Sequence, residues 1–460
     1  MDRRWWGGLV ALLGLLVACS PKGSVLVAGG IKPSSGASST PGSTPSPAAP
    51  VATTSVTATE NGGQTLVHGR NVVETEFWDA AHVHLVDAMI GVDAPLTIAP
   101  GATVDFLPGA GLVIAPGGTG SMVASGSPGL PILFDSAAAS PSPGDWCGID
   151  VGSSAAIPSG APGGSCVLDH VVVADAGQAR AGQPTPPPGQ DWAAVHVFPG
   201  SVLSVTDSTV SASAGSGLQL DVDPLQTAVT LNQFGKNAFE DNADYPIQMD
   251  PNLVGRLDTA TTFTGDGTES VRLLALGGER TEIRTTQTWL KLTQDGNPSN
   301  SDVVPYSWPL ALTSVEGTET LDHGVHILFD PQGVMDIYQY GQIDAMGTQM
   351  DPVIFDSINS LTYTAQPGDW VGLRFLCCQD ELSNTDILHA GYGGLNNEYY
   401  SADLGVGNLY SAVTSVTLDG VLLMNGSGAG LAMDGNTAFP VDNYTNISNV
   451  GPATESVTWY

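Results

Sequence analysis

The segment Leu96-Thr-Ile-Ala-Pro-Gly-Ala-Thr-Val-Asp-Phe106 decides the fold class of this chain. It places two short apolar stretches on either side of a Pro-Gly turn, and Gly109-Ala-Gly-Leu-Val-Ile114 follows with a third. Short apolar strands that recur every roughly 8–12 residues with turn residues between them are typical of sandwiches, barrels and solenoids. Because no helical period appears beyond residue 64, we predict an all-β fold.

The same pattern occurs twice along the chain. Seven residues recur 221 positions later: Gly120, Ala124, Gly126, Pro131, Phe134, Asp135 and Ser136 return as Gly341, Ala345, Gly347, Pro352, Phe355, Asp356 and Ser357. Pro143-Gly144-Asp145-Trp146 returns as Pro367-Gly368-Asp369-Trp370. Two copies built of short strands, residues 64–273 and 274–460, favour a continuous solenoid with coils of about 20–25 residues. Such coils would number roughly 16–19 and rise about 4.8 Å each. Two tandem β-sandwiches are the structural alternative.

The segments from Leu96 to Phe106, Gly109 to Ile114, Pro131 to Phe134 and Leu168 to Gly177 resemble the right-handed parallel β-helix proteins found among bacterial secreted lipoproteins. The resemblance implies a right-handed parallel β-helix over most of the chain, from about residue 75 to about residue 450. It implies little about activity, because this scaffold carries lyases, hydrolases, adhesins and structural proteins.

The N-terminus predicts a secreted, lipid-anchored protein. Arg3 and Arg4 precede an uncharged apolar run from Leu9 to Ala18, which is typical of a signal peptide over residues 1–18. Leu16-Val17-Ala18-Cys19 resembles the lipobox of bacterial lipoproteins, which implies cleavage before Cys19 and acylation of its thiol and new amine. Since Ser20 rather than Asp follows, the resemblance favours the outer membrane if the source is Gram-negative. Residues 19–63 are rich in Ser, Thr, Pro, Gly and Ala, and we expect a disordered linker there.

Composition argues against a nucleic-acid partner, a wholly disordered chain and a membrane-spanning helix. The 460 residues contain 13 Lys and Arg against 46 Asp and Glu, a formal net charge of −33. A nucleic-acid binder needs a basic surface, so no nucleic-acid partner is expected. The apolar content of 42% is too high for a wholly disordered chain. Beyond the signal peptide no apolar stretch is long enough for a membrane-spanning helix.

Four further cysteines could pair in an oxidising compartment. The separation of Cys147 and Cys166 along the chain is close to the expected length of one coil, so we predict a disulfide between neighbouring coils. For Cys377-Cys378 a vicinal disulfide and two reduced thiols on opposite strand faces remain alternatives. A zinc site of the CxxC type is absent from the sequence.

No complete catalytic set is evident. Asn384-Thr385-Asp386 matches the first motif of polygalacturonase β-helices, but the remaining motifs do not follow, so we interpret these residues as a turn. Asp169-His170 resembles part of a pectate-lyase motif. Arg180 or Arg374 would have to approach it through the fold to supply the basic group that β-elimination needs.

Other candidate ligand residues have structural explanations. His82 and His84 lie on one face of a predicted strand, but a third ligand is not identifiable, so we predict no metal site there. We expect the recurring tryptophans Trp78, Trp146, Trp289 and Trp370 to pack in the core rather than stack on sugars. No cofactor is expected, although the turns Asp221-Val222-Asp223 and Gly265-Asp266-Gly267 could bind Ca²⁺ weakly.

The sequence therefore predicts a cell-envelope β-helix anchored to the membrane by lipid, with polysaccharides or surface proteins as its candidate partners. We expect a structural, adhesive or glycan-binding role and favour a non-enzymatic protein. A polysaccharide lyase or glycoside hydrolase on the same scaffold is the alternative.

Overall fold

The computed structural model describes most of the chain beyond the expected linker. The described residues are 55–58, 64–152, 163–179, 192–222, 228–275, 280–309, 312–338, 340–376, 379–392, 402–407, 415–434, 442–443, 446–448 and 454–457. The expected signal peptide, Cys19 and most of the expected linker lie outside these residues.

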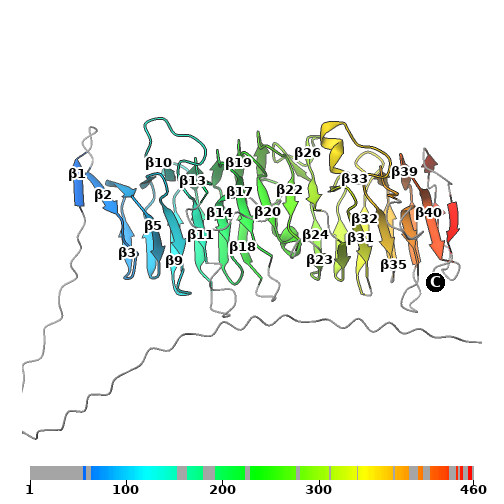
Figure 1. Cartoon of the computed structure of the whole chain (residues 1–460), viewed down its shortest axis with the longest axis horizontal. Coiled ribbons are helices and arrows are strands. Elements are labelled where there is room, and N and C mark those ends of the chain that lie inside the picture. Colours follow the sequence, from blue (N-terminus) through cyan, green and yellow to red (C-terminus); the bar gives the residue numbers. More distant parts are fainter. Residues whose placement is uncertain are drawn as a thin grey trace, which may run out of the picture. The chain divides into compact units, whose positions relative to one another are not determined.

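The structure confirms the predicted all-β parallel β-helix, in which most coils contribute one strand to each of three sheets and neighbouring coils pair in parallel (Figure 1). Sheet A comprises β1 (Ser55–Ala58), β2 (Gln64–His68), β4 (His82–Val86), β7 (Thr103–Phe106), β10 (Ile132–Ser136), β13 (Val171–Ala174), β16 (Thr209–Ser211), β19 (Ala238–Glu240) and β21 (Thr262–Thr264). Sheet C comprises β3 (Glu76–Trp78), β6 (Pro95–Ile98), β9 (Ser121–Ser125), β12 (Ser165–Asp169), β15 (Val202–Thr206) and β18 (Thr230–Gly235).

Sheet B runs through both copies and contains 13 strands. They are β5 (Met89–Val92), β8 (Gly111–Ile114), β11 (Ile149–Val151), β14 (Ala193–Val197), β17 (Ser216–Leu220), β20 (Ile247–Met249), β22 (Val271–Leu273), β27 (Tyr306–Trp308), β30 (His326–Phe329), β33 (Val353–Ser357), β36 (Thr385–Leu388), β39 (Leu422–Met424) and β42 (Asn446–Ser448).

Two new sheets replace A and C in the second copy. Sheet E comprises β23 (Arg280–Ile283), β28 (Leu312–Val315), β31 (Val334–Ile337), β34 (Gly372–Phe375), β37 (Ala402–Val406), β40 (Ala429–Asp434) and β43 (Thr454–Val457). Sheet F comprises β24 (Gln287–Trp289), β29 (Thr318–Leu321), β32 (Gln342–Met346), β35 (Gln379–Ser383), β38 (Ser415–Asp419) and β41 (Asp442–Asn443). β25 (Leu292–Thr293) and β26 (Val303–Val304) form a small antiparallel pair.

Apolar side chains stack inside the coils because alternate strand residues point to opposite faces of a sheet. In sheet B the inward column begins Ile90, Leu112, Ile149, Val195 and Leu218, all at most 2% exposed. One continuous apolar core therefore replaces the central core of a globular domain.

Many coils are longer than the sequence pattern predicted. The coil from Tyr306 to its partner Ile327 has the expected length, whereas the coil from Ile149 to its partner Val195 is about twice as long. Loops inserted between strands account for the difference, since a loop can lengthen a coil without disturbing strand pairing. For this reason the part of the chain that the structure describes contains fewer coils than the roughly 16–19 predicted, with 13 strands in sheet B.

The second copy is displaced by one face relative to the first. β10 and β33 carry the same repeated sequence, yet β10 lies in sheet A and β33 in sheet B. Near the junction of the copies the 3₁₀-helix η2 (Pro251–Arg256) stands between β20 and β21, where the preceding coils have a sheet C strand. Equivalent residues of the two copies therefore lie on different faces of the solenoid.

The described strands begin earlier than the predicted linker boundary. β1 lies within residues 19–63 and pairs antiparallel with β2, so that it covers the first strand of sheet A. Its sequence, Ser-Val-Thr-Ala, contains the β-branched residues that strands favour. Among the described residues no helix has the length and apolar character needed to cross a membrane.

Candidate functional site

The structure does not contain the predicted disulfide between Cys147 and Cys166. Cys166 lies on β12, where its neighbours in adjacent coils are Met122 and Leu203, while Cys147 precedes β11 in a different sheet. The separation of the two cysteines along the chain is less than one coil at this point, so it does not bring their sulfur atoms together. Cys147 Sγ lies 3.9 Å from Gln178 Oε1. Cys377 and Cys378 lie outside the described residues.

The recurring tryptophans are packing residues, as predicted. Trp146 and Trp370 are fully buried, and their rings stack on Phe106 at 3.9 Å and Phe329 at 4.2 Å. Each indole N–H donates to a backbone carbonyl at 2.7 Å.

The histidines near the N-terminus also have a structural role. His84 is buried, stacks on Trp78 at 5.2 Å and lies 2.9 Å from His68 in a ring-to-ring hydrogen bond. His82 instead bonds to Asp79 at 2.8 Å. The two histidines predicted to share a face thus meet at Asp79, because His84 Nε2 lies 3.0 Å from the Asp79 backbone carbonyl oxygen.

The candidate lyase and hydrolase residues that the structure describes are not assembled into a catalytic set. Arg374 does not approach Asp169, because it forms a buried two-pronged ion pair with Asp336 on sheet E. Arg180 lies outside the described residues. Asn384 occupies a left-handed turn with a φ of 42°, in agreement with its interpretation as a turn residue.

A different feature, which no local sequence pattern indicates, runs along the outer face of sheet B. Six outward-facing residues occupy successive coils in register: Asp150, His196, Gln219, Gln248, Arg272 and Ser307. We call this line the outer ladder, and it spans about 24 Å at the usual strand spacing. All of its members except His196 are at most 7% exposed, although they point away from the core.

Carboxylates hold the amides of the outer ladder in place. Asp221 Oδ1 accepts a hydrogen bond from Gln219 Nε2 at 2.7 Å and lies 3.0 Å from His196 Nε2. Gln248 Nε2 donates to Asp244 Oδ2 at 3.2 Å. The Oε1 atoms of Gln219 and Gln248 have no hydrogen-bond partner among the described residues. A buried polar atom in this state costs roughly 1–3 kcal/mol.

Arg272 is the positively charged residue of the outer ladder. Its guanidinium donates to both oxygens of Asp330, at 2.9 and 2.6 Å, and lies 5.7 Å from the centre of the Tyr245 ring. Burial alone would lower the pKa of Arg272, but the hydrogen bonds and negative charge of Asp330 outweigh it and raise that pKa. The side chain of Asp330 is 22% exposed, so this end of the ladder is accessible to solvent.

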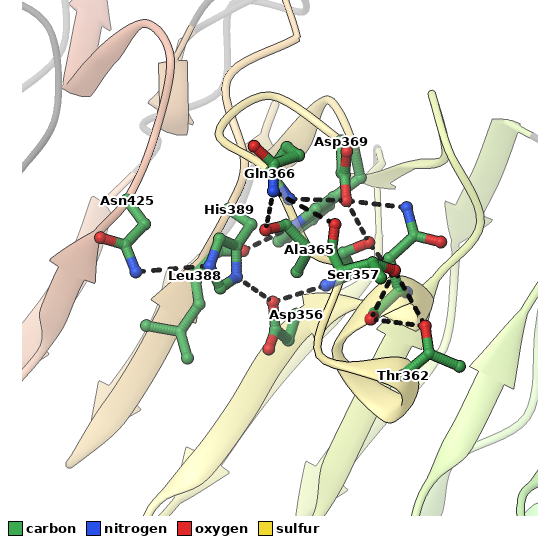
Figure 2. Close-up of polar contacts among 12 residues, drawn as sticks. Asp356, Ser357, Thr362, Ala365, Gln366, Asp369, Leu388, His389 and Asn425 are labelled. Carbon is green, nitrogen blue, oxygen red and sulfur yellow. Dashed lines mark hydrogen bonds and ion pairs between the residues drawn. The ribbon is translucent and has the colours of Figure 1, made fainter.

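The outward line of sheet B continues through Leu328 to a second polar cluster at Asp356 (Figure 2). Figure 2 shows His389 between Asp356 and Asn425, at 2.7 Å and 3.3 Å respectively. Burial raises the pKa of Asp356, and the hydrogen bond from His389 opposes that rise. Asp369 Oδ2 accepts from the Ser357 hydroxyl at 2.8 Å and thereby ties the loop to the end of β33.

The first copy has an equivalent hydrogen bond between loop and strand, which we call the loop clamp. A different residue stands beside the clamp in each copy. Asp145 Oδ2 accepts from Ser136 Oγ at 2.7 Å, which explains why Pro-Gly-Asp-Trp recurs. Asp175 stands where the second copy has His389. Burial and the neighbouring Asp135 raise the pKa of Asp175 to about 6. The clamp is therefore structural, and the residue beside it differs between copies.

No family model, no curated protein and no solved structure matches this chain. Its function therefore has to be inferred from the geometry of its own residues.

Proposed function

We propose that this chain is a lipid-anchored cell-envelope β-helix protein that binds neutral glycans along the outer ladder. The single observation that carries the proposal is the line of polar, outward-facing residues on six successive coils. A purely structural solenoid has no need of buried amides on its outer face, because apolar or exposed polar residues cost less there.

Charge favours a neutral ligand over an acidic one. The carboxylates on and beside the ladder outnumber its single arginine: they are Asp150, Asp221, Asp244 and Asp330. An anionic polysaccharide would meet these carboxylates, as well as a chain whose formal net charge is −33. Sugar hydroxyls can donate to the partly exposed carboxylates of Asp221 and Asp330, and the Tyr245 ring offers an apolar contact beside Arg272.

The test is calorimetric titration of the purified protein with neutral and acidic oligosaccharides. The second copy supplies the matched variant, because Gly405 and Ala432 occupy the positions equivalent to His196 and Gln219. We expect His196→Gly combined with Gln219→Ala to weaken binding of neutral oligosaccharides at least tenfold. Thr97→Ala on sheet C serves as the control and should bind like the unaltered protein.

Three results would contradict the proposal: binding of acidic sugars alone, binding that the double variant does not change, and release of sugar products. Unsaturated products would identify a lyase, and saturated ones a hydrolase.

The anchor is a separate part of the proposal and rests on the sequence around Cys19. Mass spectrometry of the membrane-bound protein should detect an N-terminal Cys19 that carries acyl chains. A cleaved protein with an unmodified Cys19 would refute the anchor and leave the glycan proposal untouched.

A further inference from the structure

We propose that Asp169, His170 and Asp207 form a binding site for a divalent transition-metal ion of the zinc type. One ligand atom from each of the three side chains lies within 4.8 Å of the other two. The site lies at the corner between sheets C and A, apart from the outer ladder of sheet B, and it does not depend on glycan binding.

The topology brings these residues together from two neighbouring coils. β12 ends at Asp169 and β15 ends at Thr206, and these two residues pair in register. His170 and Asp207 follow directly as the turn residues of their coils. Residues a whole coil apart in sequence therefore stand about one strand spacing apart in space.

The ligand set suits zinc better than calcium. Imidazole nitrogen and carboxylate oxygen bind zinc at about 2.0–2.2 Å, whereas calcium takes six or more oxygen ligands. Three atoms that share one zinc ion lie at most about 4.2 Å apart, so a small rotation of the side chains suffices. The existing contacts of Asp169 Oδ1, to His170 Nδ1 at 2.8 Å and from Thr206 Oγ1 at 3.2 Å, already orient it toward the imidazole.

The site is open to solvent, and only two coils supply its ligand residues. The side chains of His170 and Asp169 are 24% and 36% exposed, and Asp207 is exposed as well. An ion can therefore enter and keep water in its remaining coordination positions. The next coil places Lys236 in the same corner, which adds a positive charge rather than a fourth ligand.

The second copy shows that the turn itself does not require these residues. His170 and Asp207 adopt left-handed backbone conformations with φ of 52° and 49°. Their equivalents are Asn384, with a φ of 42°, and Gly420, with a φ of 68°. The second copy therefore forms the same left-handed turns without an imidazole or a carboxylate at these two positions.

The experiment exchanges the ligands for the residues of the second copy. Zinc is titrated into the purified full chain by calorimetry, and bound metal is counted after dialysis. We expect one more zinc ion bound by the unaltered protein than by His170→Asn combined with Asp207→Gly, which keeps the turns and the fold. Asp169→Asn retains the acceptor for the Thr206 hydroxyl and should weaken zinc binding at this site at least tenfold.

Circular dichroism of the variants verifies that the coils are intact. Equal zinc stoichiometry and affinity in the double variant and the unaltered protein would overturn the proposal, as would the absence of bound zinc in the unaltered protein. Calcium binding as tight as zinc binding at the same residues would overturn the assignment to zinc.

Discussion

Asp380 provides a sharp test of how the solenoid tolerates a carboxyl group in its core. It lies on β35 with an inward-facing side chain that is 4% exposed, in the position that Cys166 occupies in the first copy. Its Oδ1 accepts a hydrogen bond from the Ile343 backbone N–H at 2.8 Å, and its Oδ2 has no partner among the described residues. Burial raises the pKa of Asp380 from 3.8 to about 8.

A raised pKa in the folded state makes stability depend on pH in a definite direction. Below about pH 4 the carboxyl is protonated in both folded and unfolded chains, and burial of its charge costs nothing. As the pH rises toward 8, the unfolded chain ionises while the folded chain holds its proton. The folded state then loses about 1.4 kcal/mol of stability per pH unit, which accumulates to about 6 kcal/mol.

Asp380→Asn removes the charge and keeps an acceptor for the Ile343 N–H. The variant and the unaltered protein should have equal stability at pH 4, and the variant should be more stable by several kcal/mol at pH 9. Urea unfolding followed by circular dichroism at pH 4, 6, 8 and 9 measures the difference. Glu381→Gln, which removes an exposed carboxylate from the adjacent position, is the control. A stability difference for Asp380→Asn that stays constant from pH 4 to pH 9 would refute the reasoning.

Three further predictions concern the core, the ion pair on sheet E and the N-terminal end. Trp370→Ala leaves a cavity beneath the repeated loop and should destabilise the fold by about 3–5 kcal/mol, measured by urea unfolding. Arg374→Met leaves Asp336 buried without its ion-pair partner and should lower the free energy of unfolding by about 3–5 kcal/mol. Adding Asp336→Leu should restore most of that stability. A double variant as unstable as Arg374→Met would contradict this prediction. Burial and the charge of His84 lower the pKa of His68 to about 4. The stability that is present above pH 6.5 should therefore fall as the pH drops toward 4. His68→Phe should flatten this pH dependence in thermal unfolding.

The repeats were predictable because they follow from local sequence. Pro-Gly-Asp-Trp recurs since the Asp ties down a loop and the Trp fills the core beneath it, and both requirements act within a short stretch of chain. The disulfide prediction failed for a related reason. Coil length depends on loops inserted between strands, so a sequence spacing does not fix which side chains stack.

The sequence alone determined the fold class, the two copies and the packing role of the tryptophans. Strand periodicity and turn residues encode these locally.

The tertiary structure decided which residues meet. Asp150, His196, Gln219 and Gln248 have no shared motif, yet parallel pairing aligns them because each occupies the same position on its coil. The displacement of the second copy by one face likewise depends on which strands pair, and no local pattern reveals it. In a solenoid, neighbours along the axis are a full coil apart in sequence, and only the folded chain fixes the length of that coil.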